Sequence, residues 1–278
     1  MNYRHVFHAG NFADVIKHVA LVATLLHLRR KEKPFCVIDT HAGSGLYDIT
    51  GSEAARSREA ESGIARLGDL ATRAGLPAVL RTYLECVGSE GPGCYPGSAR
   101  IAARMIRQQD RLVAIENHTD EAATLAKALA PFPQARVIEG DAYQRLAALL
   151  PPRERRGAVL IDPSFETEGE FVRAAGLLAL AHRRFATGVC LLWLPLKSDA
   201  AADALGGELR TRGVTPAIRL DIDIGRGGGG AKQRLSSAGL LIVNPPYTFE
   251  AEMQAAAEFL APRLGAHGAP AAISLAPL

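Results

Sequence analysis

Two short stretches of the sequence combine a polar acceptor, a proline and an aromatic residue at the end of an apolar run. They are "LIDPSFE" at 160–166 and "VNPPYTF" at 243–249. This combination is typical of enzymes that methylate an exocyclic amine, because the amine is a poor nucleophile and needs an acceptor that aims its lone pair. A single active site requires only one of the two stretches.

The first stretch offers a complete set of roles. Asp162 and the main-chain carbonyl of Pro163 can accept both hydrogens of the amine, and Asp162 can take up the released proton. Phe165 can stack on a base that is flipped out of its helix or loop. The structural alternative is a strand end followed by an Asp-Pro turn and a core phenylalanine.

Position in the predicted sheet favours the first stretch. Asp162 ends the fourth predicted strand, which should lie beside the first strand at the switch point where open α/β sheets bind ligands. Asn244 ends the seventh strand, which we expect at the outer side of the sheet. We therefore predict that 243–249 forms the turn into the last helix.

A second group of residues indicates a nucleotide-like cofactor. In "VIDTHAGSG" (37–45), Asp39 ends a strand, and the absence of side chains at Gly43 and Gly45 lets the backbone approach a ligand. With His41, Asp39 is expected to line the methionine end of the cofactor. An ordinary tight turn is the alternative reading of these glycines.

Two later acids support the cofactor site. Glu116 ends the second predicted strand, where a carboxylate can accept ribose hydroxyls, and Asp141 follows the third, where it can bond an adenine amino group. A dinucleotide site would require a third glycine, but that position holds Asp48. S-adenosylmethionine, which carries no pyrophosphate, therefore fits better than NAD.

The N-terminal stretch "YRHVFHAGNFADVIKH" (3–18) concentrates polar and aromatic side chains before any strand. Tyr3 can stack on a base, His5 belongs to the same RNA-contacting group, Lys17 can pair with a phosphate and His18 can bond the cofactor. Because no cysteine or carboxylate set accompanies the histidines at ligand spacing, we predict no metal site. Polar residues on a wet helix face are the alternative.

The elements that position these residues follow an alternating pattern that predicts a Rossmann-like α/β fold with a seven-stranded, mostly parallel sheet. Helical spacing between the runs predicts crossover helices at 119–130, 169–185 and 200–213 and an N-terminal helix that begins near Asn11 and Asp14. The expected strands are 35–39, 111–116, 135–140, 157–162, 188–195, 217–223 and 239–244.

The first two strands are too far apart for a plain doubly wound domain. From Asp39 to Glu116 the chain runs 116 − 39 = 77 residues, whereas the acid normally follows the glycine loop by about 20. We therefore predict a methyltransferase domain of residues 1–50 and 109–278, with a small helical subdomain inserted at 51–108. The glycine-rich stretch 225–234 is either a mobile hairpin tip or a clamp for RNA.

Composition sets the remaining limits. The 278 residues carry a net charge of +3, which does not by itself indicate nucleic-acid binding. The four cysteines form no CxxC pair, and we expect them to be free thiols in a reducing compartment. No apolar run reaches the roughly 20 residues of a membrane span. We expect a soluble, cytoplasmic protein that acts as a monomer.

Several of the quoted stretches, together with "YPGS" (95–98), "RRGAVLIDPSFE" (155–166) and "RRFATG" (183–188), closely resemble the RlmJ family, bacterial enzymes that methylate an adenine of 23S ribosomal RNA on its exocyclic amine. The resemblance covers essentially the whole chain. It implies a Rossmann-like, S-adenosylmethionine-dependent methyltransferase with a helical insertion. Its substrate would be 23S rRNA, protein-free or in an early assembly intermediate.

The resemblance also assigns residues. It places the catalytic acceptor on Asp162 and an RNA contact on Tyr3. The cofactor contacts that it implies are His18, His41, Ser98, Glu116, Asp141 and Asp162.

Two positions depart from the family pattern. Ser164 replaces the second proline of an Asp-Pro-Pro-aromatic motif, and Ala142 stands beside the cofactor where the family tends to have glycine. Losing the proline frees a backbone dihedral and should slow the site without inactivating it. A DNA adenine methyltransferase and a non-catalytic RNA-binding assembly protein remain as alternatives.

Overall fold

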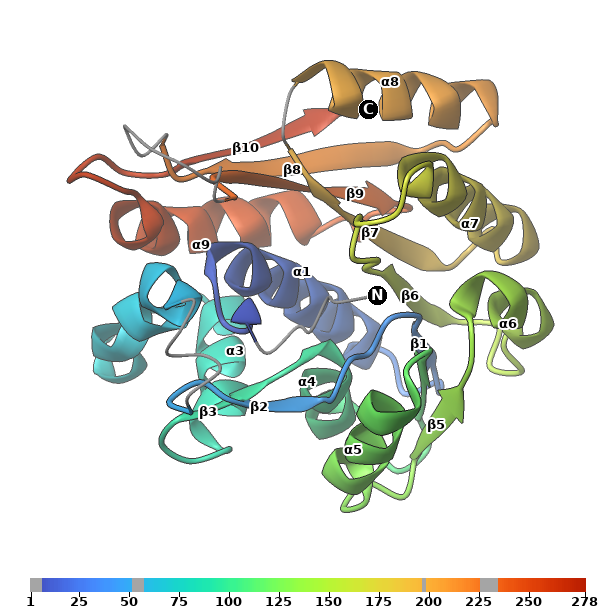
Figure 1. Cartoon of the computed structure of the whole chain (residues 1–278), viewed down its shortest axis with the longest axis horizontal. Helices are drawn as coiled ribbons and strands as arrows, with labels where there is room; N and C mark the ends of the chain where they lie inside the picture. The colour runs from blue at the N-terminus through green and yellow to red at the C-terminus, as the bar shows by residue number, and fades with distance from the viewer. Residues whose placement is uncertain (1–6, 52–57, 197–198, 226–234) are drawn as a thin grey trace.

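A computed structural model describes residues 7–51, 58–196, 199–225 and 235–278. Tyr3 and His5, part of the inserted segment and most of the glycine-rich stretch lie outside these ranges. In the described part, an eight-stranded sheet is covered by helices on both faces, and a two-stranded ribbon lies beside it (Figure 1).

The large sheet has the order β10-β8-β9-β7-β6-β1-β4-β5. Neighbouring strands from β7 to β5 run parallel, whereas β9 and β10 run antiparallel to the strands beside them. The predicted Rossmann-like class with a mostly parallel sheet is confirmed. The strands are β1 Cys36–Asp39, β4 Arg111–Glu116, β5 Ala135–Glu139, β6 Gly157–Ile161, β7 Val189–Pro195, β8 Ala217–Asp223, β9 Ser237–Val243 and β10 Ala272–Pro277.

All seven predicted strands are present, but the predicted number is one too small. The missed strand, β10, lies at the edge of the sheet against β8, and its residues are mostly exposed or half-buried. Half of its residues are alanine or proline, which are depleted in strands, so its composition does not indicate a strand. The ribbon of β2 (Leu46–Asp48) and β3 (Cys94–Pro96) was also not predicted.

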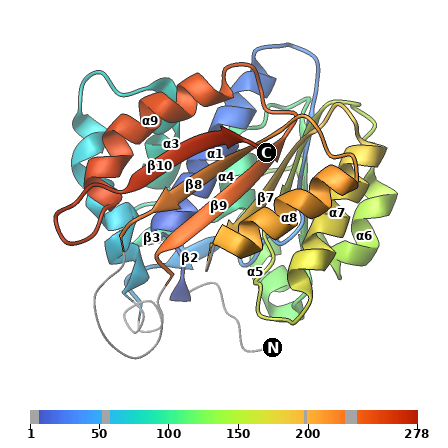
Figure 2. The ribbon, with the colours of Figure 1, turned by 90° about the horizontal axis from the view of Figure 1, so that it is seen from above.

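Helices divide between the two faces, and each face has its own core (Figures 1 and 2). Alternate residues of each strand feed the two cores: Val37 joins one and Ile38 the other. The first face carries α1 Phe12–Arg29, α3 Ala78–Gly88, α4 Ser98–Met105, α5 Thr119–Leu129 and α9 Phe249–Leu264. The second carries α6 Ala142–Leu149, α7 Glu170–Arg184 and α8 Asp199–Thr211.

Helix α1 begins where the sequence predicted. The Asn11 side chain caps it by accepting from the main-chain N–H of Asp14 at 2.9 Å, which satisfies one free donor of the first turn. The helix is buried from Phe12 to Leu25. None of the helices within the described ranges has the length and apolar composition that crossing a membrane requires.

The inserted segment packs against the rest of the molecule. It contains the 3-10 helices η2 (Glu59–Ser62) and η3 (Ile64–Thr72), with α3, β3 and α4. Strand β3 pairs with β2, and α4 lies against α1, β1 and β4. The predicted helical character is confirmed for α3 and α4, whereas the division into domains at 51 and 108 stays a prediction.

The motifs at 160–166 and 243–249 lie at opposite ends of the strands of the sheet. Strand β9 does not lie at the outer side of the sheet, as predicted, but between β7 and β8. Because it runs antiparallel to β7, with Val243 opposite Cys190, its carboxyl end meets the amino ends of the parallel strands. Asn244 is therefore remote from Asp162 because of strand direction, and the predicted exclusion of 243–249 from the cavity holds for a different reason.

Candidate active site

A cavity of about 320 Å³ opens at the carboxyl ends of the parallel strands. Its wall comes from the loops after β1, β4, β5 and β6, from the second turn of α1 and from the start of α7. The predicted site residues that line it are Lys17, His18, His41, Gly43, Ser98, Glu116, Asp141, Ala142 and Asp162.

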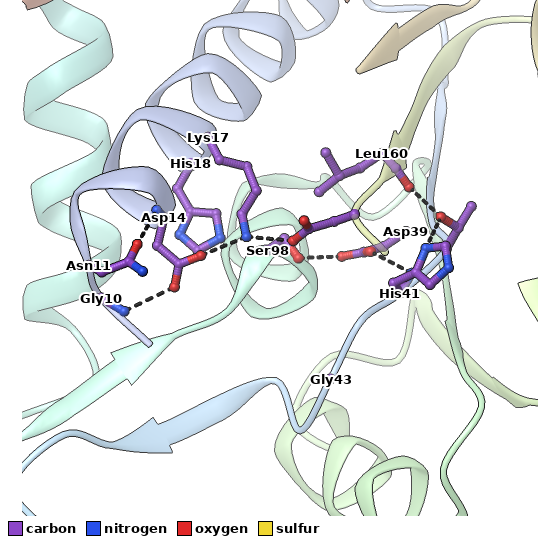
Figure 3. A network of polar contacts seen from close by, with 12 residues as sticks. Gly10, Asn11, Asp14, Lys17, His18, Asp39, His41, Gly43, Ser98 and Leu160 are labelled. Carbon is purple, nitrogen blue, oxygen red and sulfur yellow. Dashed lines mark hydrogen bonds and ion pairs between the residues drawn. The ribbon is translucent and has the colours of Figure 1, made fainter. Parts of the chain in front are cut away.

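The main acid of the cavity, Asp162, is held by a buried lysine. Lys17 Nζ donates to Asp162 Oδ2 at 2.5 Å and to Asp14 Oδ1 at 2.6 Å, and the Lys17 side chain is only 4% exposed. Burial alone would lower the pKa of Lys17, but the charges of Asp14 and Asp162 outweigh it and raise that pKa. Lys17 therefore stays charged and fixes the Asp162 carboxylate. Figure 3 shows Lys17 beside Asp14, its other carboxylate partner.

This geometry corrects the predicted role of Lys17. A lysine that is buried between two carboxylates has no exposed ammonium to offer an RNA phosphate. Asp14, in turn, accepts from the main-chain N–H of Gly10 at 2.9 Å. The cap of α1, Asp14, Lys17 and Asp162 thus form one continuous chain of polar contacts.

Asp39 lies behind the cavity wall, with 1% of its surface exposed. It accepts from Ser98 Oγ at 2.6 Å, and the main-chain N–H of His41 approaches it at 3.4 Å (Figure 3). Burial raises the pKa of Asp39 to about 6, and the charge of Asp162 adds to this, against the bond from Ser98. Asp39 does not line the cavity as predicted, but it positions two residues that do.

We expect Asp39→Asn to change the pH dependence of stability. A folded pKa raised to about 6 gives wild type a contribution that is complete below the ordinary value of about 3.8 and is lost as pH rises through 6. The variant should therefore gain up to about 3 kcal/mol relative to wild type between pH 4 and pH 7.5. Urea unfolding across that range measures the gain. The exposed Asp223→Asn is the control, and a gain no larger than the control's would contradict the buried charge.

His41 faces the cavity as a neutral ring. Burial lowers the pKa of His41 to about 4, against the charges of Asp162 and Asp141. Its Nδ1 lies 2.8 Å from Thr40 Oγ1, which fixes the ring. A neutral imidazole does not repel a cationic ligand, while the carboxylates of the wall attract one.

Two other predicted acids stand at the opposite side of the wall. Glu116 is 7% exposed and accepts from the main-chain N–H groups of Gly43 and His118, both at 2.8 Å. Asp141 caps α6 by accepting from the Tyr143 N–H at 2.9 Å. Glu116, Asp141 and Asp162 therefore reach one cavity, as predicted.

The fold itself leaves no room for a side chain at either of the two predicted glycines. Both have positive φ, +58° at Gly43 and +76° at Gly45. An added Cβ would lie 2.1 Å from the Tyr47 hydroxyl at Gly43 and 2.7 Å from Leu125 at Gly45. Gly43 lines the cavity, whereas Gly45 lies under α5 and does not.

The residues after Asp162 are only partly placed as predicted. Phe165 has φ +53°, and its ring packs 4.6 Å from Phe171 and 5.8 Å from Trp193 between centroids. Neither Pro163 nor Phe165 belongs to the cavity wall described here, whereas Ser164 does. Stacking of Phe165 on a base stays a prediction.

Two sets of contacts that the sequence did not reveal support the wall of the cavity. Arg173 lies 3.9 Å above the Tyr143 ring, and the buried Glu170 accepts from the Tyr143 hydroxyl at 3.3 Å. His18 is held from behind by Tyr95, whose hydroxyl lies 2.8 Å from its Nδ1. The sequence did offer a signal for Glu170 and Arg173, because they follow the Asp162 motif closely and their i, i+3 spacing places both on one face of a helix.

Comparison with known proteins fits this geometry. A family model described as "Ribosomal RNA large subunit methyltransferase D, RlmJ" matches residues 32–273. The chain belongs to this family. Two RlmJ relatives, each named "Ribosomal RNA large subunit methyltransferase J", are 34% identical over 91% of this chain and 90% of the Escherichia coli protein, and 31% identical over 96% of this chain and 95% of the Haemophilus influenzae protein.

A solved structure has a similar fold over nearly the whole chain. The crystal structure of the Legionella pneumophila protein LPL1258 has a TM-score of 0.86 and 30% identity, covering 97% of this chain and 98% of its own. The predicted RlmJ family and the predicted fold class are thus confirmed.

The wall suits S-adenosylmethionine, the methyl donor that RlmJ membership implies. Glu116 offers a carboxylate for ribose hydroxyls, Ala142 and Tyr143 offer apolar surface beside Asp141, and His18 and Ser98 offer polar atoms at the α1 side. The neutral His41 and the carboxylates match a positively charged sulfonium. No group of residues in the described ranges has the composition and geometry of a metal site.

Proposed function

We propose that this protein transfers a methyl group from S-adenosylmethionine to the N6 amine of an adenine in 23S ribosomal RNA. Bound S-adenosylmethionine supplies an electrophilic methyl group. The observation that carries the proposal is the Asp162 carboxylate, which opens into the same cavity as Glu116 and is fixed by Lys17 at 2.5 Å. RlmJ relatives are named for the same class of substrate.

The chain's own residues account for the activation of the amine. Asp162 Oδ2 is engaged by Lys17, and its Oδ1 has no hydrogen-bond partner among the described residues. We assign Oδ1 and the Pro163 carbonyl to the two hydrogens of the amine, with Asp162 taking up the proton. Lys17 prevents the carboxylate from rotating, so the acceptor is already aimed when the base enters.

The direct test is transfer of labelled methyl to protein-free large-subunit rRNA, followed by mass spectrometry of the nucleosides. N6-methyladenine should form with the RNA and not with duplex DNA of matched adenine content. Product on DNA alone would identify a DNA methyltransferase. No thermal stabilisation by S-adenosylmethionine, together with no product on either substrate, would favour a non-catalytic RNA-binding protein. Activity on protein-free rRNA, and not only on assembly intermediates, is part of the proposal.

We expect Ser164→Pro to keep or raise the rate of methyl transfer. The Ser164 N–H donates no hydrogen bond within the described residues, so proline would remove no contact there. A fixed φ would also reduce the freedom of the turn that follows Asp162. Single-turnover rates of wild type and variant at saturating cofactor measure the effect. A loss of tenfold or more would show that the serine contributes to the site through its hydroxyl, and Ser164→Ala separates that contribution from backbone strain.

A further inference from the structure

The motif at 243–249 forms a rigid turn at the amino ends of the parallel strands, opposite the cavity. Asn244 has φ +53° and donates from Nδ2 to the carbonyls of Ala186 and Gly188, both at 2.8 Å. Phe249 is fully buried and anchors the start of α9. Between these anchors, Tyr247 is 82% exposed.

The exposed Tyr247 side chain is held in place by α1. Arg30 donates to its hydroxyl at 2.8 Å, and the guanidinium lies 5.7 Å from the ring centroid. The His27 ring meets it edge-on at 5.4 Å. An exposed aromatic ring that is oriented by its neighbours loses little entropy when another flat group stacks on it.

Two basic segments that are distant in sequence meet at the end of α1, whose Arg30 contacts Tyr247. Arg156 donates to the carbonyls of Leu28 and Lys33, and Arg107 donates to those of Lys31 and Lys33. The Arg156 bonds hold 29–33 against 153–156, and the Arg107 bonds hold 31–33 against the segment before β4. We call Tyr247 together with segments 29–33 and 153–156 the rear surface.

The rear surface is strongly positive. Its segments carry +3 (29–33) and +2 (153–156), whereas the whole chain carries only +3, so the rest of the chain is net negative. Of its two acids, Glu154 is 4% exposed and paired with Arg111 and Arg153, and the exposed Glu32 lies 3.8 Å from Arg107. Arg30 also pairs with Glu252 of α9 at 3.3 Å. The six exposed cations are Arg29, Arg30, Lys31, Lys33, Arg153 and Arg155.

We propose that the rear surface binds RNA, as a second contact for the RNA whose adenine enters the cavity. Basic side chains beside an oriented aromatic ring are what backbone binding and base stacking require. Basic residues at a helix C-terminus would by themselves be explained by the helix dipole. That explanation covers Arg29 but neither the second segment nor the exposed Tyr247.

Helix α1 connects the cavity to the rear surface. It runs from Lys17 in the cavity wall to Arg29 at the rear surface, and its rise of about 1.5 Å per residue separates them by about 18 Å. An RNA that reaches both must therefore extend well past the target adenine. The proposal rests on the proposed function only for the identity of this RNA.

The test compares binding of two fluorescent RNAs, a long fragment of large-subunit rRNA and a short oligonucleotide around the modified adenine. Tyr247→Ala should weaken binding of the long RNA about tenfold. Lys31→Gln/Lys33→Gln should also weaken it and lower the slope of log affinity against log salt by about 1 to 2. Neither lysine side chain takes part in a hydrogen bond or ion pair within the described ranges, so folding should be unaffected.

The matched control is Arg73→Gln. Arg73 is exposed and lies 5.3 Å above the ring of Phe259, near the other end of α9, so it repeats the arginine-aromatic arrangement away from the rear surface. This variant should bind both RNAs like wild type. In methylation assays, the rear-surface variants should raise KM for the long RNA at unchanged kcat and unchanged cofactor affinity.

The possible results of these experiments separate the rear-surface proposal from the proposed function. Wild-type affinity and salt slope in both rear-surface variants would overturn the inference, even if methylation is confirmed. Weakened RNA binding without methyl transfer by wild type would support the inference and overturn the proposed function. Equal losses with long and short RNA would overturn the idea of a separate contact. Tyr247-dependent binding to vesicles of anionic phospholipid that exceeds RNA binding would overturn RNA as the partner.

Discussion

Asp162→Asn should lower the rate of methyl transfer by about 10²- to 10⁴-fold while cofactor affinity changes little. The amide has nearly the shape of the carboxylate but cannot take up the proton of the amine. It also replaces an acceptor with a donor on one side, so only one of the amine hydrogens can be held. Single-turnover kinetics with labelled cofactor measure the loss, and calorimetry measures cofactor affinity.

The control for this variant is Asp223→Asn, the same chemical change at the end of β8, where Asp223 is exposed and bonds the Gly225 N–H. Its turnover should equal that of wild type. Undiminished turnover in Asp162→Asn would remove the residue from the mechanism and leave Lys17 without a catalytic partner.

Lys17→Met should reduce both stability and activity by large amounts. It leaves Asp14 and Asp162 close together without the buried cation between them, and breaking a buried ion pair on one side costs about 3 to 5 kcal/mol. Activity should fall with it, because Asp162 loses the contact that fixes its orientation. Denaturant unfolding gives the first quantity, and single-turnover rates at a temperature where the variant is folded give the second.

A double variant separates the two effects. Asp14→Asn/Lys17→Gln removes one negative and one positive charge, so it should recover part of the lost stability. It should not recover activity, because Asp162 still lacks its ammonium partner. Recovery of wild-type turnover in the double variant would show that Lys17 serves only the fold.

Much of the site could be predicted from the sequence because its residues stand at strand ends. In an α/β sheet, the carboxyl ends of parallel strands meet at one edge, so Glu116, Asp141 and Asp162 had to approach one another if the strands were parallel. Strand detection rested on apolar runs rich in β-branched residues, which β1, β4 and β6 have, whereas half of the edge strand β10 is alanine or proline.

The errors have a common physical origin. Lys17 was assigned to RNA because a lysine is normally exposed, but two carboxylates from different elements allow it to be buried. Asp39 and Gly45 were placed in the cavity wall because they flank it in sequence, whereas the structure turns them toward Ser98 and α5. Sequence proximity to a loop does not determine which way a side chain points.

The sequence by itself determined seven strands of the large sheet, the cap of α1, the acids at the strand ends and the family, because these depend on local composition and on the order of motifs. Only the tertiary structure decided which acid is paired with a cation and which of the two motifs reaches the cavity. Lys17 meets Asp162 across 145 positions, and Asn244 is separated from the cavity because β9 runs antiparallel. Such pairings depend on strand direction and helix packing, which no local pattern contains.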